Sequence, residues 1–354
     1  MSIPIRNLYY MFCYAWERFP EGESVEVGVD DCPDLPNLFA RLLINGGNRL
    51  LRRGLDRGYV QHVEETRAPR GKMLLDEIIK KQTLRSGAVI CAFDDLTVDV
   101  LHNQLIKGTA LQLAKSTELK PTLAHDLRLL ARRMEGVTSV RPLAGQFRRV
   151  QLSRNTGQYA PLLQLCEIVT RNLLPDQSGD NARFASILDD EVQMSKIFED
   201  FLRNFYRIEQ RQFYSISAET LKWNGYAVTE ISRPHLPNMI TDITLRSANR
   251  VVVIDAKFYK DVLIPSYGTD KVKSANLYQM LAYLQHTALG LTAQVDGILL
   301  YPMTGVPIQL HYRLLGHDLQ IVTVDLTQPW PAIHNELLQI LFKNPATVET
   351  SQAA

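Results

Sequence analysis

Two aspartates and a lysine, placed near a predicted turn, are the residues of this sequence best arranged for chemistry. Asp255 and Lys257 follow the apolar run VVVI at residues 251–254, and Asp242 lies on the segment before it. The turn SANR at residues 247–250 predicts that residues 239–246 and 250–259 pair as a hairpin, which brings the two aspartates close together. Facing carboxylates repel each other unless a cation lies between them, and their hard oxygen atoms favour Mg²⁺ or Mn²⁺. The pattern therefore predicts a metal-binding pair of acids, with a lysine within reach of a metal-bound water or a phosphate.

A surface Asp–Lys pair at the end of a strand is the alternative interpretation. The acid-x-Lys pattern also occurs as ELK at residues 118–120, in a helical stretch that ends at Pro121, which shows that chance alone can produce it. The run at 251–254 is apolar on both faces, which is typical of an internal strand. Charged groups would be costly to bury there, so we expect that end of the strand to open into a cleft.

Three further residues are candidates for the same site. Gln279 and Tyr283 are spaced i, i+4 on a predicted helix over residues 274–287, so they share one face of it. Glu199 lies on a predicted amphipathic helix over residues 187–210. For Glu199, a solvated position on the helix explains the pattern equally well.

The elements around these residues predict two domains, divided by a stretch rich in Pro, Ser, Gly and Asp at residues 173–183. Residues 1–175 mix helices and strands without a regular alternation, which predicts an α+β domain. Its predicted helix at 37–55 is broken at Asn45-Gly46-Gly47. Residues 184–350 contain helix, several strands (226–232 among them), helix and strand, which predicts an α/β domain with a mixed central sheet flanked by helices.

The composition excludes several classes of protein. The four cysteines form no CxxC pair and the eight histidines form no HExxH motif, so neither a zinc site nor a disulfide framework is indicated. The net charge of +1 gives no global basic field for nucleic acid. The N-terminus shows no cleavable signal, and no apolar run is long enough to span a membrane. We therefore expect a cytoplasmic protein that does not associate with membranes.

The order of acid on a strand, Asp-x-Lys on the next strand and Gln-x-x-x-Tyr on the following helix resembles the RecB-like branch of the PD-(D/E)xK nuclease superfamily. In these enzymes the two acids bind a metal ion and the lysine helps to position the attacking water. The resemblance implies that Asp242, Asp255 and Lys257 are catalytic, with Gln279 and Tyr283 as accessory residues. It also implies Mg²⁺, or alternatively Mn²⁺, held by Asp242 and Asp255 with Glu199 as a third candidate ligand.

Nearly the whole chain is similar to the McrC family, the nuclease subunits of McrBC modification-dependent restriction systems. The segments that carry this similarity are IPIRNLYYMFCYAW (3–16), CAFDDLTVDVLHNQLIKGTALQL (91–113), PNMITDITLRS (237–247), IDAKFYK (254–260), NLYQMLAYL (276–284) and QPWPAIHNELLQI (328–340).

This second resemblance implies an endonuclease subunit that cuts double-stranded DNA containing 5-methylcytosine. Its partner would be McrB, an AAA+ GTPase hexamer that recognises the methylated base and binds the GTP. The N-terminal domain would dock into that ring and stimulate GTP hydrolysis. This chain has no GxxxxGK[ST] loop, in agreement with nucleotide binding by the partner. A stand-alone RecB-like nuclease in repair or phage defence, and a non-catalytic activator of an AAA+ ring, are the alternatives.

Overall fold

The chain forms two compact units, and the first is interrupted by the second. The computed structural model describes residues 3–16, 32–175, 182–184, 190–259, 262–264 and 270–342. One unit combines Met1–Asp31 with Ser186–Ala354, and we call it the split unit. The other, Cys32–Ala185, is the inserted unit. This division differs from the predicted domains 1–175 and 184–350 because residues 1–31 belong with the C-terminal part of the chain.

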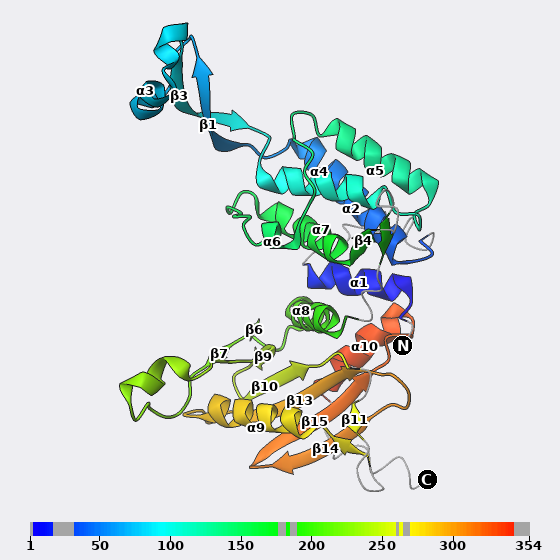
Figure 1. Cartoon of the computed structure of the whole chain (residues 1–354). Helices are drawn as coiled ribbons and strands as arrows, with labels where there is room; N and C mark the ends of the chain where they lie inside the picture. The colour runs from blue at the N-terminus through cyan, green and yellow to red at the C-terminus, as the bar shows by residue number, and fades with distance from the viewer. Residues whose placement is uncertain are drawn as a thin grey trace. The chain divides into compact units, whose positions relative to one another are not determined.

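The inserted unit combines a helical bundle with an extended β-ribbon (Figure 1). Its helices are α2 (Leu35–Arg53), α3 (Leu75–Lys81), α4 (Leu101–Leu113), α5 (Pro121–Arg133), α6 (Ala144–Phe147) and α7 (Ala160–Asn172). Its strands are β1 (Gly58–Thr66), β2 (Lys72–Met73), β3 (Val89–Thr97), β4 (Leu173–Pro175) and β5 (Ala182–Phe184). Helices α2, α4, α5 and α7 pack together, and strands β1, β3 and β2 form an antiparallel sheet in that order.

Helix α2 is continuous, so the predicted break at Asn45-Gly46-Gly47 is wrong. Both glycines are buried at helix contacts. A Cβ on Gly46 would lie 2.6 Å from a methyl group of Leu162, and one on Gly47 would lie 2.6 Å from a methyl group of Leu130. The two glycines therefore allow α7 and α5 to approach α2 closely, and the packing outweighs their low helix propensity.

The split unit contains a six-stranded sheet and the helices that cover it (Figure 1). Its helices are α1 (Ile5–Ala15), α8 (Glu191–Glu209), α9 (Ser274–Ala288) and α10 (Trp330–Ile340). Its strands are β6 (Ser215–Ser217), β7 (Thr220–Leu221), β8 (Met239–Ile240), β9 (Ile243–Arg246), β10 (Arg250–Ala256), β11 (Leu263–Ile264), β12 (Lys271–Val272), β13 (Gln294–Pro302), β14 (Gln309–Leu314) and β15 (His317–Val324). None of the described helices is long and apolar enough to cross a membrane.

The strand order β14-β15-β13-β10-β9-β6 confirms a mixed sheet. Strand β10 is central and runs parallel to β13, while its other neighbour, β9, is antiparallel. The predicted hairpin between β9 and β10 is present, with Val251 opposite Arg246 and Ile254 opposite Ile243. The predicted strand at 226–232 is wrong, because residues 230–235 form a 3-10 turn and Tyr226, Val228 and Ile231 are exposed.

The alternation of side chains along β10 places a different helix on each face of the sheet. Val251 and Val253 share a buried cluster with Met280 and Leu284 of α9. On the opposite face, the ring of Phe258 packs edge-on against Phe198 of α8, with centroids 5.7 Å apart. Asp255 has the parity of Val251 and Val253, so its carboxylate belongs to the α9 side of the sheet.

Helix α1 is held in the split unit by aromatic contacts. Tyr10 stacks on Trp330 with ring centroids 4.6 Å apart, and Tyr14 packs against Phe201, Phe205 and Trp330. The Tyr14 hydroxyl also donates a 2.8 Å hydrogen bond to Glu209 of α8. These contacts explain why the first helix belongs with α8 and α10, rather than with the unit that comes next in the chain.

Candidate active site

The pair of aspartates lies where β8 ends and β9 begins, beside the end of β10. A bend at Thr241 and Asp242 separates β8 from β9. The β9–β10 register, continued by one residue beyond Ile243 and Ile254, places Asp242 beside Asp255. The backbone N–H of Ala256 donates a 2.9 Å hydrogen bond to Oδ2 of Asp242. The hairpin therefore brings the two carboxylates together, as the turn at 247–250 predicted.

Asp255 and Lys257 form a buried ion pair at the end of β10. Asp255 is completely buried, and the Lys257 side chain is 13% exposed. Nζ of Lys257 lies 3.0 Å from Oδ1 and 2.9 Å from Oδ2 of Asp255, but only the contact with Oδ1 has hydrogen-bond geometry. With the aspartates ionised, Oδ2 accepts no hydrogen bond from any residue that the structure describes. A buried carboxylate oxygen in this condition is suited to bind a cation.

Burial and the mutual repulsion of the two carboxylates raise the pKa of Asp255, and burial raises the pKa of Asp242. Burial first, and then the negative charge of the adjacent Asp242, raise the pKa of Asp255 to about 7 against the opposing effect of Lys257. Burial also raises the pKa of Asp242, and Lys257 opposes that change as well. Burial by itself would lower the pKa of Lys257, but the two carboxylates raise it overall, so the lysine stays charged.

Helix α9 brings Gln279 and Tyr283 to the same region. Nε2 of Gln279 donates a 2.8 Å hydrogen bond to the Tyr283 hydroxyl, which in turn donates a 2.7 Å bond to the carbonyl oxygen of Ile240. The charges of Asp255, Asp242 and Lys257 all influence the pKa of Tyr283, which burial raises. Gln279 and Tyr283 thus lie beside the aspartates, and the Tyr283 hydroxyl binds the backbone two residues before Asp242.

Helix α8 supplies Glu199 from the other side. Glu199 is half-buried, and its pKa rises to about 7, first through burial and then through the negative charge of Asp242. Lys257 lowers the pKa of Glu199, so this carboxylate is within electrostatic range of the same site. Glu199 is therefore not a fully solvated helical residue.

The arrangement suits a divalent cation, with two aspartates as its nearest protein ligands. The buried carboxylate of Asp255, with one oxygen that accepts no hydrogen bond, and the partly buried carboxylate of Asp242 both have raised pKa values, and a cation would stabilise both of them. Within the described ranges, no group of three His, Cys, Asp or Glu side chains is close enough to hold a metal ion together. Asp242 and Asp255 therefore form the core of the candidate site, while Glu199 lies in its outer part.

Two residues near the site were not predicted by the sequence analysis. Arg203 is one helical turn after Glu199, and its Nε donates a 2.9 Å hydrogen bond to the backbone oxygen of Asp242. Tyr301 of β13 is fully buried, accepts a 2.8 Å hydrogen bond from Asn276, and is influenced by the charges of Asp255 and Lys257. The i, i+4 spacing of Glu199 and Arg203 is a sequence signal that could have identified Arg203. Tyr301 lies near the end of an ordinary apolar strand, and no sequence signal identifies it.

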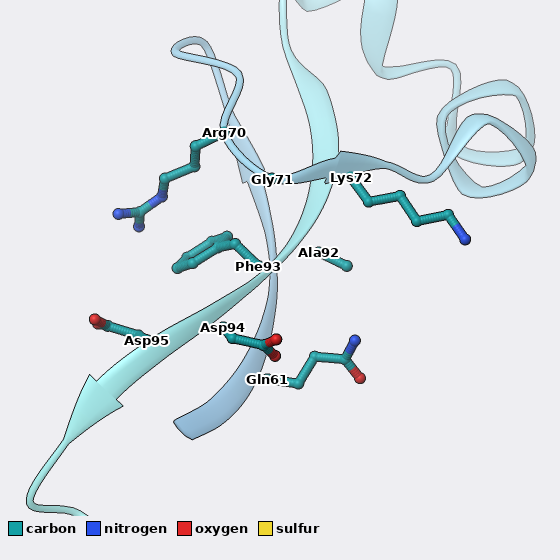
Figure 2. Close-up of a pocket in the computed structure, with 8 residues that line it drawn as sticks. All are labelled: Gln61, Arg70, Gly71, Lys72, Ala92, Phe93, Asp94 and Asp95. Carbon is teal, nitrogen blue, oxygen red and sulfur yellow. The ribbon is translucent and has the colours of Figure 1, made fainter. Parts of the chain in front are cut away.

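A separate hollow of about 620 Å³ lies on the β-ribbon of the inserted unit (Figure 2). Its lining residues are Gln61, Arg70, Gly71, Lys72, Ala92, Phe93, Asp94 and Asp95. The guanidinium of Arg70 lies 3.7 Å from the centre of the Phe93 ring and 2.8 Å from the carboxylate of Glu64. The Arg70 guanidinium is already paired with Glu64. None of the predicted site residues lines the hollow, so the hollow is not part of the candidate active site.

Comparison with known proteins agrees with the resemblance predicted from the sequence. Residues 5–302 match the model of the family described as McrBC 5-methylcytosine restriction system component. The chain is 32% identical over 338 residues to the Type IV methyl-directed restriction enzyme EcoKMcrBC of Escherichia coli strain K12, covering 96% of this chain and 97% of that relative.

Solved structures show a similar fold. A chain in the half-complex of a tetradecameric assembly of Thermococcus gammatolerans McrB AAA+ hexamers with bound McrC matches 96% of this chain and 75% of its own length. The TM-score is 0.52 and the identity is 18%. The matches of the family model and of the bacterial relative both extend through the split and inserted units, and the chain therefore belongs to the family of McrBC 5-methylcytosine restriction system components.

Proposed function

We propose that this chain is the metal-dependent endonuclease subunit of a restriction system that cuts DNA containing 5-methylcytosine. The observation that carries the proposal is the buried carboxylate of Asp255 at the end of β10, in contact with Lys257 and beside Asp242. The central β10, its antiparallel neighbour β9 and the covering helices α8 and α9 suit a PD-(D/E)xK nuclease domain. Such a system would act on DNA in the cytoplasm.

The relatives support the choice of substrate and partner. The Escherichia coli relative is a methyl-directed restriction enzyme, and the structurally similar archaeal chain comes from an assembly of McrB AAA+ hexamers with McrC. We expect this chain to work with a McrB-like AAA+ GTPase hexamer that binds the GTP and finds the methylated cytosine. The net charge of +1 suits a subunit whose affinity for DNA comes largely from such a partner.

Asp242 and Asp255 would hold Mg²⁺, with Mn²⁺ as an alternative. When bound, the ion would supply charge stabilisation at the phosphate and lower the pKa of a coordinated water. The hydrogen bond from the Ala256 N–H fixes one oxygen of Asp242. Lys257 keeps its positive charge and donates a hydrogen bond to Oδ1 of Asp255, so its ammonium lies at the site, where it can orient the attacking water or hold a phosphate oxygen. Tyr283 and Gln279 hold the backbone that leads into Asp242.

The inserted unit is our candidate for docking into the partner ring. Its ribbon and the adjacent helix α3 expose large apolar side chains, among them Tyr59 (76%), Leu75 (63%) and Ile79 (72%). Exposed apolar groups gathered on one projecting element are typical of a protein interface. The division of the chain into two units would then separate ring docking from DNA cleavage.

An Asp255→Ala variant, assayed for cleavage of methylated DNA, tests the proposal. The variant, mixed with the partner, GTP and Mg²⁺, is expected to stimulate GTP hydrolysis normally but to leave the DNA uncut. An Asp255→Ala protein that still cuts methylated DNA would overturn the catalytic assignment. The wild-type chain is also incubated with Mg²⁺ and DNA alone, and strong cutting there would overturn the dependence on a partner.

A further inference from the structure

Two helices on opposite faces of the sheet donate hydrogen bonds to the short segment that carries Asp242. From α9, the Tyr283 hydroxyl donates to the carbonyl oxygen of Ile240 over 2.7 Å. From α8, Nε of Arg203 donates to the carbonyl oxygen of Asp242 over 2.9 Å. The two acceptors are only two residues apart, with Thr241 between them and the bend at Asp242. We call this pair of contacts the backbone clamp.

We propose that Arg203 is a positioning residue for the nuclease site, acting with Tyr283 through the backbone clamp to fix the carboxylate of Asp242 against β10. The inference rests on the proposed function, since it assigns a role in that same site. Arg203 does not contact Asp255 or Lys257 in the hydrogen bonds that the structure shows. Its hydrogen bond is made to the backbone of Asp242, and its positive charge also acts to lower the pKa of the Asp242 carboxyl, so the test must separate the hydrogen bond from the charge.

The bend needs such support because the backbone pairing of β9 with β10 stops just before it. The paired residues of β9 and β10 end at Ile243 and Ile254, so Asp242 is just outside the ladder. Asp242 is also beside another carboxylate, and the repulsion between them tends to push the segment outward. On the outer side, Thr241 is tied to Glu219 by a 2.9 Å backbone hydrogen bond, and Glu219 accepts two bonds of 2.7 Å from Arg246.

Among the described residues, Arg203 has one other hydrogen-bond partner, Asp200, which offers a control. Its Nη1 donates a 2.8 Å hydrogen bond to Asp200, three residues earlier on α8. This second bond orients the guanidinium, while Nε reaches the carbonyl of Asp242. An Asp200→Asn variant weakens the first contact but leaves the second possible, so it separates the ion pair from the backbone clamp.

Three substitutions of Arg203 distinguish a hydrogen bond from a charge. The amide nitrogen of glutamine is the same number of bonds from the backbone as Nε of arginine, so Arg203→Gln can donate to the carbonyl without a charge. Arg203→Met has similar reach and no donor, and Arg203→Lys keeps the charge on a longer stem. We expect glutamine to retain function within about threefold and methionine to lose about 10- to 100-fold, the usual cost of removing support from a metal ligand.

The readouts are Mn²⁺ binding to the chain alone, measured by calorimetry, and cleavage of methylated DNA with partner, GTP and Mg²⁺. The backbone clamp predicts that Mn²⁺ affinity and cleavage both fall in Arg203→Met and are both restored in Arg203→Gln. Asp200→Asn should stay within about threefold of wild type, because an i, i+3 ion pair that is still partly exposed contributes little. Arg313→Met is the matched control, because Arg313 forms an exposed ion pair with Asp318 elsewhere in the same unit.

Several outcomes would overturn the proposal. Wild-type Mn²⁺ affinity and cleavage in Arg203→Met would show that the contact does not position Asp242. If Mn²⁺ affinity and cleavage were lost in Arg203→Gln but retained in Arg203→Lys, the effect would be due to the charge. Loss that follows the melting temperature equally in all three variants would assign Arg203 to stability. In each case the wild-type chain still binds Mn²⁺ and cuts DNA, whereas failure of the wild type in both assays would instead contradict the proposed function.

A double-mutant cycle tests whether the two helices act on the same segment. Tyr283→Phe removes the donor to Ile240 and keeps the ring. If both contacts hold one bend, the combined Arg203→Met and Tyr283→Phe variant loses clearly less or more Mn²⁺ affinity than the product of the single losses. Strictly multiplicative losses would show that the residues act independently, and the backbone clamp would be rejected.

Discussion

The backbone N–H of Ala256 donates a 2.9 Å hydrogen bond to Oδ2 of Asp242, so β10 helps to position the carboxylate of its neighbouring segment. The same strand carries Asp255 one residue earlier. Strand β10 is thus both the source of one carboxylate and the support for the other. Because the bond joins backbone to side chain, it depends on the β9–β10 register and survives a change of charge on Asp242.

Asp242→Asn is expected to fold normally but to be inactive. The amide oxygen of asparagine can accept the same bond from Ala256, and the loss of a buried charge removes repulsion with Asp255. We expect the free energy of unfolding to fall by no more than about 1 kcal/mol. Cleavage of methylated DNA should drop by more than about 100-fold, the scale of losing a group that stabilises the transition state. Chemical denaturation and a cleavage assay check the two parts, and an active Asp242→Asn protein would exclude Asp242 as a metal ligand.

The metal-free protein is expected to lose stability as pH rises from 5 to 8. The pKa values of Asp255 and Glu199 are raised to about 7 in the folded state, so between their unfolded values and about 7 the folded chain binds more protons than the unfolded chain. Stability then falls with increasing pH over this window and levels off above it. Denaturant midpoints at several pH values, with a metal chelator present, measure the slope.

Asp255→Asn provides the control for this pH dependence. It removes the more deeply buried of the two carboxylates, so the decline in stability between pH 5 and 8 should become shallower. Added Mg²⁺ should flatten the wild-type profile in the same way, because a bound cation favours the ionised carboxylates. An identical slope in wild type and Asp255→Asn would show that these carboxylates do not cause the decline.

The sequence predicted the chemistry of the site better than the contacts that support it. The aspartates could be paired because a four-residue turn sets the register of the hairpin, and register depends on local spacing. The contact between Arg203 and the carbonyl of Asp242 could not be predicted, since it joins a helix to a bend 39 residues away. Such a contact depends on how α8 lies on the sheet, which the periodicity of the helix alone does not determine.

The errors in the fold have a common physical cause. Gly46 and Gly47 usually interrupt helices, but in α2 they are needed for the close approach of Leu162 and Leu130. The alternating apolar residues at 226–232 suit a strand, yet Pro234 and Pro237 follow closely and none of the strands that the structure describes pairs with the segment. Likewise, α1 could not be assigned to the split unit, because that assignment depends on aromatic contacts with α8 and α10. In each case tertiary packing outweighs a local pattern.

Gly108→Ala is expected to destabilise the inserted unit selectively. A Cβ at this position of α4 would lie 2.2 Å from the backbone oxygen of Val140 and 2.9 Å from the ring of Pro142. Overpacking against backbone costs about 1–3 kcal/mol, which exceeds the gain of about 1 kcal/mol in helix propensity. Stimulation of the partner GTPase should weaken, and hydrogen exchange should accelerate in α4.

Gly145→Ala is the matched control, because a Cβ there meets no atom within 4 Å. It should leave both GTPase stimulation and hydrogen exchange unchanged. If Gly108→Ala accelerated exchange in α8 and left α4 protected, the division into the two units would be wrong.

Tyr14→Ala is expected to produce the opposite pattern, with damage confined to the split unit. Tyr14 is buried against Phe201, Phe205 and Trp330, and its hydroxyl binds Glu209. Truncation of a buried aromatic residue costs about 3–5 kcal/mol. Hydrogen exchange should therefore accelerate in α8 and α10 while α4 and α7 remain protected, and DNA cleavage should fall while GTPase stimulation persists. Tyr214→Ala, at a site that is 76% exposed in the same unit, should change neither quantity. Faster exchange in α4 and α7 with no change in α8 would instead assign the first helix to the inserted unit, as its position in the chain predicted.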